Sequence, residues 1–290
     1  KEITWFLIRT ISGLFRILPH GGAVALGGRL GSVLWFFSRS RVDRAEKRAV
    51  RALGVGVTIA RRIVRDSYEN LGRSVAEMSR LPWMLNRLDK YVRFHGEDNL
   101  RNAINKGKGV IFLTSHMGNW EMLAAFVSRK GYPMNAIGAE QRDQRITDLI
   151  FEIREKCGIK TISKGFDLKS AIRCLKRGEI LGVLIDQDVR EKGIVVPFLG
   201  LPASTPYGPV KIAHKLESPI LPVFMIRKDK GPYHDLYILP PLEDPSGKTF
   251  GEDIGSSTAE ANRVLGDWIR RYPDHWMWLY PRWATTLGDR

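Results

Sequence analysis

The sequence predicts an α/β fold in which helices flank a central mixed, largely parallel sheet, preceded by an N-terminal amphipathic helical extension. Two apolar runs, at residues 109–115 and 180–185, have the length and composition of buried strands. Helix signals lie between such runs, and this alternation is typical of a sheet with helices on its faces. The first 80 residues instead look helical, amphipathic and basic.

We expect a single domain with two regions. Residues 1–80 form the N-terminal helical, membrane-associated region, and residues 81–290 form the α/β core. A chain of 290 residues is long for one compact domain but within the range of a single α/β domain. No internal repeat or low-complexity linker divides it.

The N-terminal stretch has features of an interfacial membrane attachment. Apolar residues recur at helical spacing, and the longest charge-free run, residues 17–28, is shorter than the roughly 20 residues that span a bilayer. A monotopic attachment therefore fits better than a transmembrane helix, and no cleavage site indicates a signal peptide. A pair of ordinary packing helices is the alternative. Because no initiator Met is present, we allow for a missing upstream segment.

The composition is strongly basic, with 46 lysines and arginines against 31 acidic residues and a formal charge of +15. This surplus must lie on the surface, because unpaired charges are costly to bury. It favours a polyanionic partner: anionic lipid, an acidic carrier protein or nucleic acid. Residues 38–65 are especially basic, which suits an anionic membrane or a plain solvated face. Because no nucleic-acid-binding motif is recognisable, we do not expect a nucleic-acid partner.

Apolar runs and capping signals define the expected elements of the core. Thr205 followed by proline predicts a helix start, and Ser257 with Glu260 predicts a capping box. The expected strands cover residues 109–115, 134–138, 160–163, 180–185, 219–226 and 236–239. The expected helices cover residues 119–130, 167–176, 205–216 and 257–272.

Chemistry is expected in the segment His-Met-Gly-Asn-Trp-Glu, at the end of the first core strand. His116 ends the apolar run, and ligands gather at the carboxyl ends of strands in open α/β sheets. Glu121 falls in the first turn of the next helix, and Gly118 permits a tight turn that would fold its carboxylate back toward the ring. A histidine backed by a carboxylate is a general-base unit, which can activate a substrate hydroxyl. A structural histidine is the alternative.

Metal and thiol chemistry have little support in the sequence. The spacing of His116 and Glu121 is not that of a helical zinc pair, and no third histidine lies nearby, so we expect no metal. Cys157 and Cys174 have no CxxC spacing and are too few for a disulfide framework. We expect free thiols in a reducing compartment.

Further polar residues are candidates for binding a substrate at the same sheet edge. Asp186, Asp188 and Arg190 follow the strand at residues 180–185 and could position sugar or glycerol hydroxyls. An Asx turn that caps the strand end is the alternative reading. Arg142 could bind a phosphate or stabilise an oxyanion, or it could be a solvated charge.

Two segments near the C-terminus complete the candidates. An apolar loop from residue 196 leads to Thr205, where the N–H groups of the predicted helix could hold a phosphate or an oxyanion. A plain capped helix is the alternative. Residues 272–283 are rich in tryptophan and tyrosine, which suits a membrane interface or an aromatic core.

Four blocks in register resemble the bacterial lipid A late acyltransferases, the lauroyl and myristoyl transferases within the lysophospholipid acyltransferase superfamily. They are an HxxxxE box, a strand-end acidic block, a central Pro-Phe-Leu-Gly loop and a closing P-x-x-[WY]-x-W-x-x-x-R pattern. The box alone is a weak signal, whereas the four blocks together cover nearly the whole chain. The matching residues are His116, Glu121, Asp186, Asp188, residues 197–200, Thr205, Pro206, Pro273, Trp278 and Arg282.

The resemblance implies an enzyme of the bacterial inner membrane, monotopic or peripheral on the cytoplasmic face. It implies transfer of a fatty acyl group from acyl carrier protein, or from coenzyme A, to a hydroxyl of a lipid A precursor, with no cofactor beyond the thioester co-substrate. By carry-over, His116 is the base and Glu121 orients it. A lysophospholipid or another glycolipid is the alternative acceptor. The residues expected to bind substrate are Arg142, Asp186, Asp188, Arg190, Thr205 and Arg282.

Overall fold

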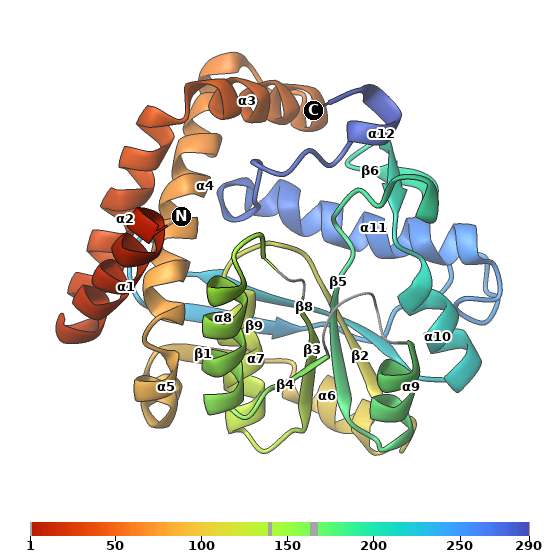
Figure 1. The fold of residues 1–290 in the computed structure, drawn as a ribbon. Coiled ribbons are helices and arrows are strands. Elements are labelled where there is room, and N and C mark those ends of the chain that lie inside the picture. The colour runs from red at the N-terminus through yellow and green to blue at the C-terminus, as the bar shows by residue number, and fades with distance from the viewer. Residues whose placement is uncertain (1, 139–140, 163–167, 290) are drawn as a thin grey trace.

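The centre of the protein is a mixed, largely parallel sheet, as predicted (Figure 1). The computed structural model describes residues 2–138, 141–162 and 168–289. The strands of the sheet within these residues are β1 (Val92–His95), β2 (Val110–Thr114), β3 (Met134–Ile137), β4 (Lys160–Ile162), β5 (Ile180–Leu184), β8 (Ile220–Arg227) and β9 (His234–Ile238). Their order is β1-β9-β8-β2-β5-β3-β4, and only β8 and β9 pair antiparallel within it.

Helices cover both faces of the sheet. Successive side chains of a strand point to opposite faces. In β2, Val110 and Phe112 therefore join one core, and Ile111 and Leu113 join the other. The first core is covered by α5 (Leu81–Met84), α6 (Glu97–Ile104), α7 (Trp120–Arg129) and α8 (Gln144–Lys156). The second is covered by α9 (Leu168–Lys176), α10 (Gly208–Leu216) and α11 (Ile254–Arg271).

The first 80 residues are helical, as expected. Helices α2 and α4 lie side by side (Figure 1), and glycines let their backbones touch. A Cβ on Gly31 would lie 2.2 Å from the carbonyl oxygen of Tyr68, and one on Gly72 would lie 2.2 Å from that of Gly27. Buried side chains of α3 and α4 share a core with α10 and α11. The four helices are α1 (Glu2–Ile17), α2 (His20–Phe37), α3 (Arg39–Leu53) and α4 (Val57–Met78).

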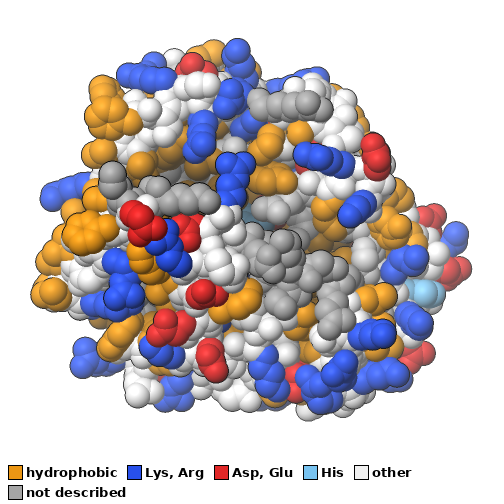
Figure 2. Space-filling view, viewed as in Figure 1, with side chains coloured by type: hydrophobic (Ala, Val, Ile, Leu, Met, Phe, Trp, Pro, Cys, Tyr) orange, Lys and Arg blue, Asp and Glu red, His pale blue; other side chains and the backbone are white. Residues whose placement is uncertain are grey.

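Helices α1 and α2 expose large apolar side chains, among them Ile17, Leu34 and Phe37. Figure 2 shows lysine and arginine side chains interspersed with hydrophobic ones on this side of the molecule. No helix in the described part of the chain combines the length and the apolar character that crossing a bilayer requires.

The segment from residue 196 to Thr205 differs from the prediction. In place of an apolar loop, it forms most of a hairpin of β6 (Ile194–Phe198) and β7 (Leu201–Thr205). The two turn residues, Leu199 and Gly200, have φ values of 52° and 83°, as a type I′ turn requires. The prediction failed because Leu-Gly is not one of the usual pairs for this turn, which favours Asn-Gly or Asp-Gly.

Two helix starts were also placed wrongly. Thr205 ends β7 and does not cap α10, which begins at Gly208 after Tyr207. Helix α11 is capped by the carboxylate of Asp253, which accepts a hydrogen bond from the N–H of Ser256. Ser257 lies inside the helix, so the predicted capping box does not form.

Some elements were not predicted. Strand β1 and helix α6 are short and have few apolar positions, whereas α8 has apolar residues at positions 146, 149, 150 and 153, a helical spacing that the sequence reading missed. The remaining short elements are η1 (Leu85–Lys90), η2 (Arg190–Lys192), η3 (Pro273–His275) and α12 (Ala284–Leu287).

The two cysteines are free and buried, one on each side of the sheet. Cys157 lies in the core under α8, and Cys174 lies in the core under α9. Burial, reinforced by a nearby glutamate in each case, raises the pKa of both thiols to about 12. Neither thiol therefore has the thiolate character that a cysteine nucleophile needs.

Candidate active site

His116 and Asp186 meet at the carboxyl edge of the sheet. His116 follows β2, Asp186 follows β5, and these two strands are parallel neighbours. Nδ1 of the imidazole lies 2.8 Å from one carboxylate oxygen of Asp186. The backbone N–H of His116 donates to the other oxygen at 2.8 Å. The strand order thus joins a histidine and an acid that are 70 residues apart in the chain.

The carboxylate of Asp186 is buried and has a third donor. Nε1 of Trp276 donates to it at 2.8 Å. Burial alone would raise the pKa of Asp186, but the charge of His116 and the hydrogen bonds from His116 and Trp276 outweigh it, so the pKa lies below its usual value. The acid is therefore ionised at neutral pH and holds the imidazole in one orientation.

The second ring nitrogen of His116, Nε2, lies 3.4 Å from the side-chain nitrogen of Gln187, which can donate to it. The side chain of His116 is 20% exposed, and Trp120 packs edge-on against its ring. Because Nδ1 faces a carboxylate, the neutral tautomer carries its proton there. Nε2 is then the nitrogen that can accept a proton.

The expected contact between Glu121 and the ring of His116 is not made. Both oxygens of Glu121 accept from Arg154, at 2.9 Å from Nε and 2.6 Å from Nη2. The two residues are buried between α7 and α8. The first turn of α7 directs Glu121 toward α8. Asp186, and not Glu121, is the acid that bonds the ring of His116.

The loop after His116 is fixed by close backbone contacts. Gly118 has φ = 62°, and a Cβ there would lie 1.7 Å from the carbonyl oxygen of Met225, so only glycine fits. Its N–H donates to the carbonyl of His275, and the N–H of Met277 donates to the carbonyl of His116. The side chain of Asn119 caps α7.

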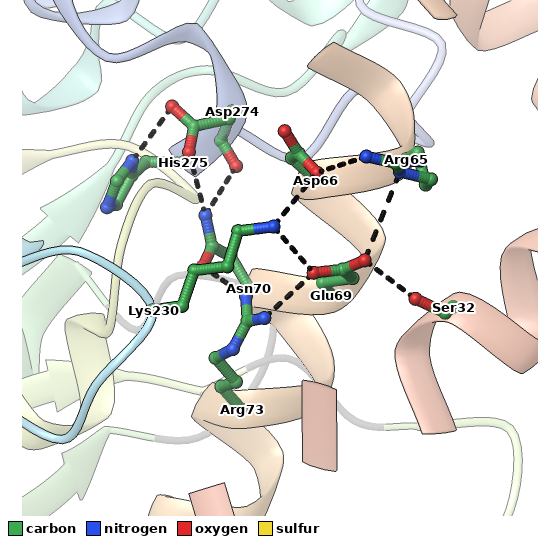
Figure 3. A network of polar contacts seen from close by, with 9 residues as sticks. All are labelled: Ser32, Arg65, Asp66, Glu69, Asn70, Arg73, Lys230, Asp274 and His275. Carbon is green, nitrogen blue, oxygen red and sulfur yellow. Dashed lines mark hydrogen bonds and ion pairs between the residues drawn. The ribbon is translucent and has the colours of Figure 1, made fainter. Parts of the chain in front are cut away.

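Helix α4 holds residues 272–283, the closing segment, against this loop. Asn70 donates to the backbone oxygen of Asp274 at 3.0 Å and to its carboxylate at 3.1 Å (Figure 3). Ser67 donates to the carbonyl of Trp276. In the same network Glu69 of α4 accepts from Lys230, which lies in the turn between β8 and β9.

Two turns farther along α4, a buried ion pair supports the same loop. Glu77 accepts two hydrogen bonds from Arg227, each at 2.7 Å, and one from the side-chain amide of Asn119. Burial would raise the pKa of Glu77, but the charges of His234 and Arg227 and these hydrogen bonds hold it below its usual value.

The chain matches the family model of the bacterial lipid A biosynthesis acyltransferases over residues 1–285. It belongs to this family.

Curated relatives fall into two groups of named acyltransferases. A phosphatidylinositol mannoside acyltransferase of Mycobacterium tuberculosis (strain CDC 1551 / Oshkosh) is 24% identical, over 88% of this chain and 81% of the relative. The lipid A biosynthesis palmitoleoyltransferase of Escherichia coli K12 is 24% identical, over 98% and 91%. The lauroyltransferase of the same organism is 24% identical, over 98% and 92%. The protein is thus an acyltransferase.

The other strand-end residues of this acyltransferase have different surroundings. Asp188 accepts hydrogen bonds from the N–H and hydroxyl of Thr285 and from the N–H of Arg190. Asp188 therefore forms an Asx turn after the strand, which was the alternative to a role in binding substrate. The side chains of Arg190 and Arg142 are exposed.

Arg282 and Thr205 are fully buried and bonded to each other. Nη2 of Arg282 donates to Thr205 Oγ1 at 2.6 Å, and Nη1 donates to the carbonyl of Ser204. Burial lowers the pKa of Arg282 to about 10, against the raising effects of Asp186 and Asp188. The structure gives these two residues this supporting contact in place of the expected contact with substrate.

An apolar cavity of about 960 Å³ begins beside the acidic strand end. Leu184 and Ile185, which precede Asp186, line it together with Ile212 of α10 and Ile254 of α11. A cavity of this kind suits an apolar ligand. Among the described residues, no group of three His, Cys, Asp or Glu side chains is arranged to hold a metal ion.

Proposed function

We propose that the protein transfers a fatty acyl group from an acyl carrier protein thioester, or from coenzyme A, to a hydroxyl of a lipid A precursor. His116 Nε2 takes the proton as the hydroxyl oxygen attacks the thioester carbonyl. The new C–O bond forms, the C–S bond breaks, and the ring returns the proton to the departing thiolate. Asp186 fixes the tautomer and stabilises the imidazolium. The acyl group passes directly between substrates, without a covalent intermediate on the protein.

The observation that carries this proposal is the His116–Asp186 pair. The imidazole has a buried carboxylate behind Nδ1 and is itself partly exposed, which is an arrangement that suits a general base. Nothing in the pair supplies a nucleophile, so the attacking oxygen comes from the acceptor. We assign Glu121 a positioning role, because its ion pair with Arg154 fixes the start of α7 directly after the histidine loop.

The apolar cavity beside Asp186 is the proposed site for the acyl chain. It starts at Ile185, one residue before the acid, and continues between α9, α10 and α11. A chain in this cavity would bring its thioester carbonyl to the sheet edge. Arg142 and Arg190 have exposed side chains. We propose that these two arginines contact the acceptor.

A second acceptor class is favoured by the mycobacterial relatives. Their name specifies phosphatidylinositol mannoside, a glycolipid whose sugar also offers a hydroxyl. The same general base would serve either acceptor, since it contacts only the attacking hydroxyl. We therefore keep another glycolipid, or a lysophospholipid, as the alternative acceptor.

We also propose that the enzyme acts on the cytoplasmic face of the inner membrane. The exposed apolar residues of α1 and α2 would lie among lipid chains, and the charge of +15 would attract anionic lipids and acyl carrier protein. This attachment needs no membrane-spanning helix.

The function is tested by removing each member of the pair. His116→Ala and Asp186→Asn should each lower acyl transfer on the order of 10²–10⁴-fold, because a lost or misoriented general base has effects of this size. The assay uses purified protein with acyl carrier protein thioester or acyl-coenzyme A, and with a lipid A precursor, a glycolipid or a lysophosphatidate, and identifies the lipid that gains mass.

A second histidine–aspartate pair in the same chain gives a matched control. His95 and Asp235 lie 2.7 Å apart on β1 and β9. Because this pair lies on strands other than those that carry His116 and Asp186, His95→Ala and Asp235→Asn should leave transfer unchanged. Wild-type rates in His116→Ala or in Asp186→Asn would refute the mechanism.

A further inference from the structure

A small basic pocket lies among the N-terminal helices. It has a volume of about 60 Å³ and is lined by Arg16 of α1, His20 of α2, Arg80, Trp83 of α5 and Arg87 of η1. None of these residues belongs to the site around His116. A water molecule occupies about 30 Å³ of the liquid. The pocket thus has room for a phosphate-sized group.

The positive charges of this pocket form no ion pair with an acid among the described residues, although Glu152 interacts electrostatically with Arg16. No carboxylate lines it, and the groups that Arg80 and Arg16 bond are neutral carbonyls: Phe15 and Leu18 for Arg80, Ser79 for Arg16. No ion pair reaches the exposed Arg87 within the described part of the chain. Like charges held close together and partly out of water repel, and an anion between them relieves the repulsion.

The acid with the largest electrostatic effect on His20 is already committed elsewhere. Glu77 tends to raise the pKa of His20, but burial and Arg80 outweigh it and the pKa lies below its usual value. Both oxygens of Glu77 are bonded to Arg227. The pocket therefore gains no local counter-ion from this network.

Polar groups in the pocket also lack protein partners. Both ring nitrogens of His20 and Nε of Arg80 are buried without a hydrogen bond. Buried polar groups in folded proteins are nearly always satisfied, so these atoms are open to bonding a ligand. Phosphate oxygens match them, because arginine binds phosphate through parallel N–H donors.

The surroundings of the pocket indicate where such a phosphate comes from. Trp83 is 58% exposed, and the guanidinium of Arg16 stacks over its ring at 4.2 Å. Ile17, next to Arg16, is 84% exposed. Tryptophan and arginine beside exposed apolar side chains are typical of the level of lipid headgroups at a membrane surface.

We propose that this pocket binds a phosphate group presented by the headgroup of a membrane phospholipid. Arg16, Arg80 and Arg87 contact the phosphate oxygens, and His20 donates one N–H. The bound headgroup sets the depth and orientation of the N-terminal helices at the surface. The proposal does not rest on the chemistry of His116.

The test compares two anions of equal charge. Two kinds of vesicle are made from a neutral glycolipid. One contains phosphatidylglycerol, and the other contains enough oleate to carry the same negative charge, so only the first presents phosphate. The wild-type protein should prefer the phosphate vesicles in flotation. Arg87→Gln, at an exposed position, should lose this preference on the order of tenfold, since one charge-assisted contact is removed.

Arg173→Gln in α9 removes the same charge from another exposed position and should retain the preference. A second arm measures the melting temperature in sodium phosphate and in sodium chloride of equal ionic strength. Stabilisation by inorganic phosphate that Arg87→Gln abolishes, without any vesicle preference, would show a soluble phosphate as the ligand and overturn the lipid source. Identical behaviour of Arg87→Gln and wild type in both arms would overturn the site.

Discussion

A single indole completes the hydrogen bonding of the acid in the proposed general-base pair. Trp276 Nε1 donates to Asp186, and the same residue lies in the closing segment that pairs with the histidine loop. Its hydrogen bond helps to keep the pKa of Asp186 low although the side chain is buried. In the proposed mechanism, Trp276 is a positioning residue that acts on His116 through the acid.

Trp276→Phe should preserve most of the packing but remove this donor. A hydrogen bond to a charged group contributes about 1.5–3 kcal/mol, so kcat should fall on the order of 10- to 100-fold. The pKa of Asp186 should also rise, so the carboxylate is protonated at a higher pH as the solution is acidified. The acidic limb of the pH–rate profile should therefore move to higher pH.

Trp278→Phe is the matched control, because its Nε1 donates to the carbonyl of Pro273 and not to Asp186. It should leave the acidic limb in place. An unshifted profile in Trp276→Phe would remove the positioning role.

Sequence reasoning placed His116 at the sheet edge but did not foresee that Asp186 bonds its ring. His116 lies two residues beyond the end of β2, close to the strand end where the sequence pattern placed it. Glu121 was chosen because it is near in the sequence, whereas Asp186 becomes a neighbour only through the pairing of β2 with β5. Arg282 was expected to bind substrate from the resemblance alone, and the structure buries it and satisfies it with backbone and hydroxyl acceptors.

At the scale of elements, α4 connects parts of the chain that carry the site. It contacts α2 through glycines, the closing segment through Ser67 and Asn70, and the histidine loop through Glu77. The helix itself was predictable from its apolar spacing. Its partners were not, since they depend on long-range contacts that no local pattern encodes.

Gly31→Ala should destabilise the contact of α2 with α4. The new Cβ would lie 2.2 Å from the carbonyl oxygen of Tyr68 and 2.8 Å from Cα of Glu69, so the helices must separate. Overpacking of this kind costs about 1–3 kcal/mol, and the melting temperature should fall by several degrees.

Gly21→Ala lies in the same helix, with nothing within 4 Å of its Cβ. It should be neutral or slightly stabilising, because alanine favours the helix. Equal melting temperatures of the two variants would contradict the close packing.

At the scale of the whole molecule, the alternation of strands and helices was enough to predict the fold class. It did not predict that β1 and β9 run opposite to the other strands of the sheet, because strand order is a non-local property. The basic, apolar N-terminal surface was also foreseen from composition and spacing. How that surface is used stays a prediction.

The protein should cosediment with anionic vesicles, and salt should release only part of it. Salt screens the attraction due to the charge of +15, but it does not weaken apolar contacts. Leu34→Ser combined with Phe37→Ser should therefore lower the fraction that resists salt, whereas Val195→Ser, an exposed apolar position on β6, should not. Wild-type protein that ignores vesicles would refute the attachment.

The burial of Cys157 and Cys174 has a practical consequence. Alkylating dyes react with thiolates, and a pKa of about 12 leaves almost none at neutral pH. A new cysteine on an exposed helix, for example Phe37→Cys, would then take up a fluorophore selectively in an otherwise native background. The depth of that fluorophore in a bilayer could be read by quenchers placed along the lipid tails.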